Sequence, residues 1–275
     1  MLRNSDVRST DRWFRPISRG STSSPTRLIC FPHAGGTASY FRDWAGLVPP
    51  DVEVLAVRYP GREDRITDPL PETMTELVDG ISTAVHAFFD KPLAFFGHSM
   101  GASVAYEVAA RLRVEHLSAP RPSTDSTRHT PRPVALFVSG RSAPGRETAC
   151  SIAEFSDDEL VEDVVHKGGA EAHVFADPEL RSLILPVIRS DYRLLERYGR
   201  GKTDGSPLDI PVFAYHGDED VDIAPAAVAG WSAVTQGPFA VRSFSGGHFY
   251  LSDHAEELVG DVVGNLRSLV GFPVH

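Results

Sequence analysis

Residues 93–112 read LAFFGHSMGASVAYEVAARL, and this stretch decides the fold. An apolar run at 93–96 leads into a Gly-x-Ser-x-Gly pattern at 97–101, and a segment rich in alanine and valine follows at once. A strand, a sharp turn and a helix in this order form a nucleophile elbow, which presents its serine at the N-terminus of the helix. Glycine suits the flanking positions because the tight turn leaves no room for a Cβ atom. The pattern predicts a nucleophilic Ser99, whereas an ordinary strand–helix turn would leave the serine idle.

Outward from this elbow, strand-like and helix-like runs alternate along the chain. The expected strands are short and apolar, at 13–17, 27–31, 52–59, 93–96, 134–139, 210–216 and 239–244. The expected helices are amphipathic or rich in alanine, at 37–47, 74–89, 102–112 and 252–269. Such alternation is typical of a mostly parallel central sheet with helices on both faces. Together with the elbow, it predicts an α/β protein with the α/β-hydrolase fold.

The segment 141–200 departs from this alternation. Ser156 and Glu159 match a capping box at the start of one helix. A second helix is expected over 178–198, and Pro186 inside it predicts a kink. Two successive helices with no strand between them predict a helical lid insertion at about 141–200.

The composition predicts a single globular domain over 1–275. Of the 275 residues, 41% are hydrophobic and 23% are charged, which is ordinary for a globular chain. A net charge of −10 argues against a nucleic-acid partner, because the phosphates would be repelled. The polar N-terminus resembles no secretory signal, and proline and glycine interrupt the uncharged stretch 223–241, so no membrane span is expected. We expect a cytoplasmic protein in which Cys30 and Cys150 are reduced thiols.

A serine needs a base to take its proton, and His248 is the best candidate. It lies in Ser-Gly-Gly-His-Phe at 245–249, directly after the last expected strand. In this fold the chain order is serine, then acid, then histidine. His98 and His216 do not fit that order, and His254 is expected in the closing helix, where it would be solvated.

The acid that orients the histidine should follow the strand at 210–216. The sequence there, His-Gly-Asp-Glu-Asp-Val-Asp at 216–222, offers four carboxylates in five positions. The acid must be buried against the histidine, to fix its tautomer and stabilise the imidazolium. Asp220 is our choice, with Asp218 and Asp222 as alternatives.

An oxyanion hole would complete this set of groups. One expected donor is the backbone N–H of Met100, which follows the nucleophile. The other should come from a loop after an earlier strand, and Phe-Pro-His-Ala-Gly-Gly at 31–36 fits, with the Ala34 N–H as donor. The alternative for this segment is a plain glycine turn.

Four segments together resemble the type II thioesterases, the discrete editing enzymes of polyketide and nonribosomal peptide biosynthesis. The segments are FPHAGGTAS at 31–39, YPGRED at 59–64, GHSMGA at 97–102 and GGHF at 246–249. The first two are more specific than the elbow, and the likeness extends from about residue 13 to the C-terminus.

The resemblance implies Ser99, Asp220 and His248 as the triad, and the Ala34 and Met100 amides as the oxyanion hole. It also implies lid helices within the insertion described above. Two departures stand out. The family often has a proline after the acid, where this chain has Val221. The loop at 118–133, dense in Pro, Ser, Thr and Arg, is longer than the family leads us to expect.

The activity implied is hydrolysis of an acyl group from the phosphopantetheine thiol of a carrier protein, which would clear stalled or aberrant chains. No cofactor or metal is expected, and the acyl-loaded carrier protein is the expected partner. The alternatives on the same fold are a small-molecule carboxylesterase and an acyltransferase. A catalytically dead hydrolase acting as a binding module is disfavoured, because both the serine and the histidine are present.

Overall fold

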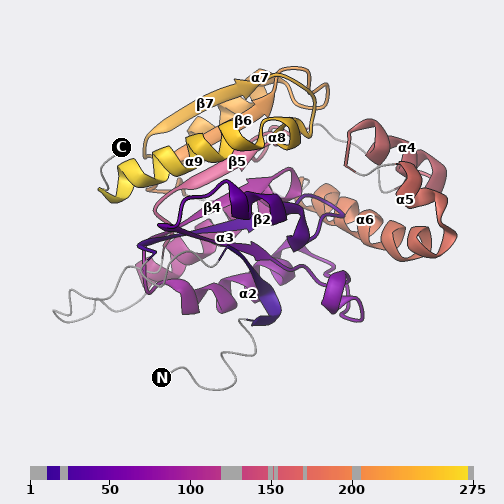
Figure 1. Ribbon diagram of the computed structural model, residues 1–275, viewed down its shortest axis with the longest axis horizontal. Coiled ribbons are helices and arrows are strands. Elements are labelled where there is room, and N and C mark those ends of the chain that lie inside the picture. Colours follow the sequence, from indigo (N-terminus) through magenta and orange to yellow (C-terminus); the bar gives the residue numbers. More distant parts are fainter. Residues whose placement is uncertain are drawn as a thin grey trace.

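The sheet is the frame of the molecule. The computed structural model describes residues 11–18, 24–118, 132–147, 151, 154–169, 172–199 and 206–271. Within these ranges seven strands form one sheet in the order β1-β3-β2-β4-β5-β6-β7 (Figure 1). The strands are β1 (Phe14–Ser18), β2 (Thr26–Phe31), β3 (Val52–Val57), β4 (Leu93–His98), β5 (Leu136–Ser139), β6 (Val212–Gly217) and β7 (Phe239–Phe244). Only β1 and β3 pair antiparallel, so the predicted mostly parallel sheet is confirmed.

The central strands β2, β4 and β5 are buried on both faces of the sheet, as their nearly continuous apolar sequences require. In β2, Ile29 and Phe31 lie in one core, shared with α2 (Met74–Val85) and α3 (Met100–Ser118). Leu28 and Cys30 lie in a second core on the opposite face. That core is shared with η1 (Ala38–Gly46) and α9 (Ala255–Val270). Helices therefore cover both faces of the sheet (Figure 1), and the period of two along β2 sets which residue enters which core.

Two predicted helices differ in detail from the structure. The segment at 37–47 is the 3-10 helix η1, which is held to the sheet by the buried side chains of Phe41 and Trp44. The closing helix is divided at His254 into α8 (Tyr250–Asp253) and α9, and the His254 ring packs on Phe244 at 5.7 Å. The remaining short elements are η2 (Glu63–Arg65), η3 (His86–Phe88), α7 (Pro225–Ala229) and η5 (Gly230–Val234). No helix in the described part of the chain is long and apolar enough to cross a membrane.

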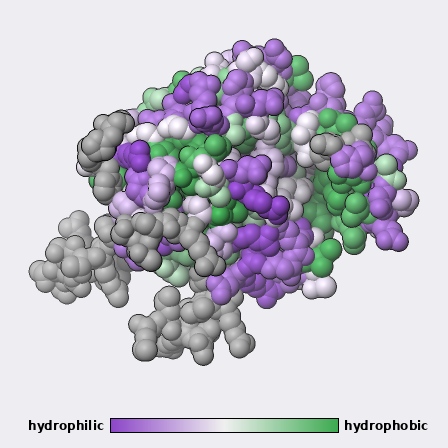
Figure 2. All heavy atoms as spheres, in the orientation of Figure 1, coloured by the Kyte–Doolittle hydropathy of each residue, from purple (hydrophilic) through white to green (hydrophobic). Residues whose placement is uncertain are grey.

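Between β5 and β6 the described residues form three α-helices, which are α4 (Asp157–His166), α5 (Ala172–Ala176) and α6 (Pro178–Gly199). The predicted capping box begins α4, with Glu159 N donating to Ser156 Oγ and Ser156 N donating to Glu159 Oε2. The short α5 was not predicted. The helices share an apolar cluster of their own and project from one end of the sheet (Figure 1). Figure 2 shows hydrophobic side chains on them, with hydrophilic ones along their outer rim.

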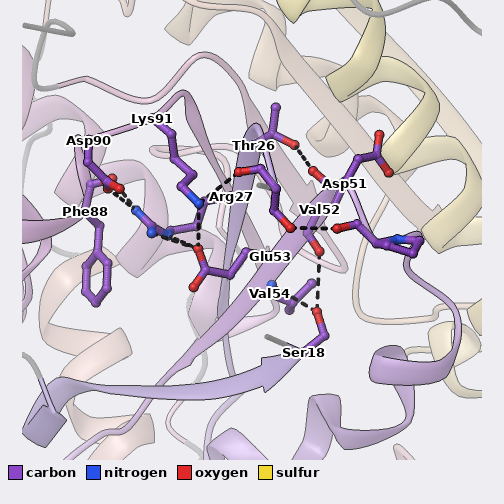
Figure 3. Close-up of polar contacts among 12 residues, drawn as sticks. Ser18, Thr26, Arg27, Asp51, Val52, Glu53, Val54, Phe88, Asp90 and Lys91 are labelled. Atoms are coloured by element: carbon purple, nitrogen blue, oxygen red, sulfur yellow. Dashed lines mark hydrogen bonds and ion pairs between the residues drawn. The ribbon is translucent and has the colours of Figure 1, made fainter. Parts of the chain in front are cut away.

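A polar network closes the opposite end of the parallel strands (Figure 3). Arg27, at the start of β2 and 6% exposed, donates to Glu53, to Asp90 and to the Phe88 carbonyl, over 2.9, 2.6 and 2.6 Å. The Lys91 ammonium also reaches Glu53. The network therefore lies away from the C-terminal ends of the strands, which is where ligands bind in parallel sheets.

Two features discussed in the sequence analysis lie at residues that the structure does not describe. Residues 119–131, which make up most of the predicted long loop, lie outside the described ranges, as does Cys150. Cys30 is a free, buried cysteine in the middle of the sheet.

Candidate active site

Ser99 stands in a strained turn between β4 and α3. Its φ of +53° lies in the left-handed region, which is rare for residues other than glycine and is typical of functional sites. A Cβ atom at Gly97 would overlap the carbonyl oxygen of Gly101, and one at Gly101 would overlap that of Phe31. The turn therefore has the geometry of a nucleophile elbow, and glycine is required on both sides of the serine.

The structure brings Ser99, His248 and Asp220 together from three different loops. His248 Nε2 lies 3.0 Å from Ser99 Oγ, and His248 Nδ1 lies 2.7 Å from Asp220 Oδ2. The Asp220 side chain is 1% exposed and that of His248 11%. Groups in this arrangement can act as a nucleophile, as the base that takes its proton and as the acid that orients the base.

The alternative acids have other partners. Asp218 Oδ1 accepts a hydrogen bond from the Gly246 N–H over 3.0 Å, which holds the loop that carries His248. Asp222 pairs with Lys167 over 3.2 Å. Geometry therefore favours the first choice made from the sequence, although valine follows that aspartate.

The expected oxyanion donors lie on the loops that follow two adjacent strands. Phe31 at the end of β2 pairs with Gly97 at the end of β4, so residues 33–36 and the first turn of α3 start side by side. The 33–36 segment closes as a tight turn in which Gly36 N donates to the His33 carbonyl over 2.9 Å. Met100, the first residue of α3, is fully buried. Amide donors at these two places can stabilise negative charge on an acyl oxygen attacked by the serine.

Buried histidines line this site, and no role for them was predicted from the sequence. His98 Nδ1 lies 2.9 Å from Ser139 Oγ, which in turn lies 2.6 Å from the Tyr250 hydroxyl. The His98 ring is 5.1 Å from that of His248. Burial lowers the pKa of His98, and it lowers the pKa of His33 to about 3. Both rings are therefore neutral at neutral pH and place no positive charge beside His248.

A model of the thioesterase domain family matches residues 26–265 of this chain. The chain belongs to the thioesterase family. It is therefore an enzyme that acts on thioester bonds, and it has the α/β-hydrolase fold.

Named relatives of this thioesterase support the type II resemblance. Thioesterase PikA5 of Streptomyces venezuelae is 38% identical, over 95% of this chain and 88% of its own. The type II thioesterase BorB, from the borrelidin biosynthetic cluster, superposes with a TM-score of 0.81 at 37% identity, over 94% of this chain and 98% of its own. RedJ, from the prodiginine pathway of Streptomyces coelicolor, superposes with a TM-score of 0.76 at 34% identity, over 87% of this chain and 85% of its own. The resemblance drawn from the four sequence segments is confirmed.

Proposed function

We propose that this thioesterase hydrolyses acyl groups from the phosphopantetheine arm of carrier proteins, and so removes stalled or aberrant chains in polyketide or nonribosomal peptide biosynthesis. The observation that carries the proposal is the series of hydrogen bonds that links Ser99, His248 and Asp220. It occurs in a protein that resembles discrete thioesterases along their length. BorB is matched over 98% of its chain, whereas the matched part of phenyloxazoline synthase MbtB is 16% of that protein.

The proposed mechanism uses groups of this chain alone. Ser99 Oγ attacks the thioester carbonyl carbon while His248 Nε2 takes the hydroxyl proton, and Asp220 stabilises the resulting imidazolium. The Ala34 and Met100 amides donate to the oxyanion of the tetrahedral intermediate. That intermediate collapses as His248 returns the proton to the departing pantetheine sulfur, which leaves an acyl-serine ester. His248 then takes a proton from a water molecule, whose oxygen attacks the acyl carbon to form a second tetrahedral intermediate. As this intermediate collapses, His248 returns that proton to the departing Ser99 Oγ, which releases the carboxylic acid and restores the free serine.

We also propose that α4–α6 form a lid over the serine within one domain. Two contacts support this. A Cβ atom at Gly35 would lie 2.6 Å from Ile188 Cγ1 of α6. This helix therefore packs directly on residues 33–36, which we call the predicted oxyanion loop. Gly169, after α4, packs on the ring of Phe249, the neighbour of His248. The inserted helices therefore reach the loops on both sides of the nucleophile. The cytoplasmic location expected from the sequence stays a prediction.

The test is hydrolysis of a panel of acyl groups loaded on a holo carrier protein, with each acyl group also presented as a small oxygen ester. We expect the wild type to clear the carrier faster than it cleaves the matching ester, and Ser99→Ala to do neither. Preference for the oxygen esters would point instead to a carboxylesterase. Acyl transfer to an added alcohol or amine in preference to water would point to an acyltransferase.

A further inference from the structure

A buried ion pair links the insertion to the body of the enzyme. Arg62, after β3, donates from Nη1 to Asp191 Oδ2 over 2.8 Å and from Nη2 to Oδ1 over 2.9 Å. Asp191 belongs to α6 and is 2% exposed, and Arg62 is 6% exposed. A bidentate arginine–carboxylate pair is strong and directional, but removing both charges from water is costly. Such a pair is weak evidence for stability alone, so its other contacts matter.

Both partners also hold the predicted oxyanion loop. The Gly35 N–H donates to Asp191 Oδ2 over 2.8 Å. Arg62 Nη1 donates to the Gly36 carbonyl over 3.1 Å. The ion pair thus fixes the N–H of Gly35 and the carbonyl of Gly36, the two residues that follow Ala34. We call Arg62, Asp191 and the two glycines the clasp.

The backbone of this loop depends on such support. Gly35 has a φ of +73°, which favours glycine. Ile188 of α6, which packs against this glycine, precedes Asp191 by three residues and so lies on the same side of the helix. One face of α6 therefore supplies both the apolar contact and the hydrogen-bond acceptor that keep the loop in place.

We propose that Arg62 and Asp191 are positioning residues for the oxyanion hole, and that the hole is set only when α6 is seated on the loop. The proposal rests on the assignment of the Ala34 amide as an oxyanion donor. Donors preorganised toward developing charge lose most of their effect when they shift, and a displacement of ~1 Å can cost up to about 100-fold in rate. The insertion would then contribute to catalysis as well as enclosing the acyl chain.

Three variants probe the clasp. Asp191→Asn keeps the shape and an acceptor for Gly35 but removes the charge. Arg62→Lys keeps the charge but loses the bidentate geometry. The double variant Arg62→Met with Asp191→Leu removes both charges at once, which avoids leaving one buried charge unpaired if a single variant does not fold. Asp51→Asn is the control, because it removes the charge from another bidentate pair, a partly exposed one with Arg267 of α9 over 2.7 and 2.9 Å.

Two measurements distinguish a role of the clasp in positioning the oxyanion hole from a role in folding stability alone. The first is the split between kcat and KM on an acyl-loaded carrier protein. The second is inhibition by an alkyl trifluoromethyl ketone, whose adduct with Ser99 places an oxyanion in the hole. We expect the clasp variants to lower kcat by about 10- to 100-fold and to weaken the ketone by a similar factor, with KM within about threefold. Asp51→Asn should lower Tm and leave both readouts unchanged.

Two results would overturn the proposal, in distinguishable ways. Folded clasp variants with lower Tm but wild-type kcat and ketone affinity would show that the pair is only structural. A wild type that clears the carrier through Ser99 yet does not bind the ketone would remove the oxyanion assignment on which the clasp depends. The proposed function would survive either result, since it is tested by the loss of carrier hydrolysis in Ser99→Ala.

Discussion

Asp220 and His248 are 28 residues apart in the chain, yet Oδ2 of the first lies 2.7 Å from Nδ1 of the second. Their loops follow β6 and β7, which pair in parallel up to Gly217 and Phe244. The ends of two adjacent parallel strands therefore bring the carboxylate to the imidazole. Burial of the Asp220 side chain keeps water from competing for this hydrogen bond.

Replacing this carboxylate should remove most of the activity. In Asp220→Asn the amide cannot stabilise the imidazolium, and it favours the wrong tautomer of His248, so kcat should fall by about 10³- to 10⁴-fold with little change in KM. Steady-state hydrolysis of an acyl-loaded carrier measures this. Asp218→Asn and Asp222→Asn are the controls and should stay within about tenfold of the wild type. An equal loss in either control would place the acid elsewhere.

The buried histidines should make the folded state sensitive to acid. Burial lowers the pKa of His33 from its ordinary value of 6.5 to about 3. Between these values the unfolded chain binds a proton at this position and the folded chain does not, so the free energy of unfolding falls as the pH falls. At pH values well below 6.5, one such histidine contributes ~1.4 kcal/mol per pH unit to the slope of the free energy of unfolding against pH. The lowered pKa of His98 adds to this slope in the same direction.

Chemical denaturation at a series of pH values between about 7 and 5 measures this slope. His33→Gln should flatten it, and His116→Gln, at an exposed position of α3, should not. The interpretation is wrong if both variants keep the wild-type slope.

The elbow glycines should tolerate no side chain. In Gly101→Ala the new Cβ would meet the Phe31 carbonyl, which belongs to the backbone of β2 and cannot move aside. We expect a loss of more than ~3 kcal/mol in the free energy of unfolding, together with loss of Ser99 labelling by a fluorophosphonate. Gly260→Ala in α9, where a Cβ meets nothing within 4 Å, should instead stabilise by ~0.5–1 kcal/mol. Similar stabilities for the two variants would refute the steric argument.

The network around Arg27 should affect stability and leave catalysis unchanged. Arg27→Met removes the hydrogen bonds to Glu53, Asp90 and the Phe88 carbonyl, which Figure 3 shows converging on one guanidinium. Because Asp90 is largely solvated, we expect a loss of about 1–3 kcal/mol in the free energy of unfolding. Thermal denaturation and kcat/KM together test this. A large fall in kcat/KM of the folded variant would contradict the separation of the two ends of the sheet.

Local patterns were enough to predict the frame of this enzyme. The strand, turn and helix at 93–112 share one short stretch, so the elbow could be recognised without knowledge of tertiary contacts. The capping box of α4 is equally local, because Ser156 and Glu159 are three residues apart. Chain order and its place after the last strand were enough to select His248, which the structure places 3.0 Å from Ser99 Oγ.

Long-range contacts explain what could not be predicted. Arg62 and Asp191 are 129 residues apart, so no local sequence pattern marks them as a pair. The helix breaks at His254, whose ring packs on Phe244 of β7, and helical periodicity reveals neither the break nor this contact. Four carboxylates within 218–222 look alike in sequence, and the sheet register decides which of them reaches the imidazole.

In the proposed mechanism, Ser99 takes the acyl group from a carrier-bound thioester before water releases it. Rapid quenching of the enzyme with an acyl-loaded carrier, followed by intact-protein and peptide mass spectrometry, tests this most directly. We predict loss of the acyl mass from the carrier, its transient appearance on the peptide that contains Ser99, and neither change with Ser99→Ala. A carrier that keeps its acyl group, while small oxygen esters are still cleaved through Ser99, would contradict it.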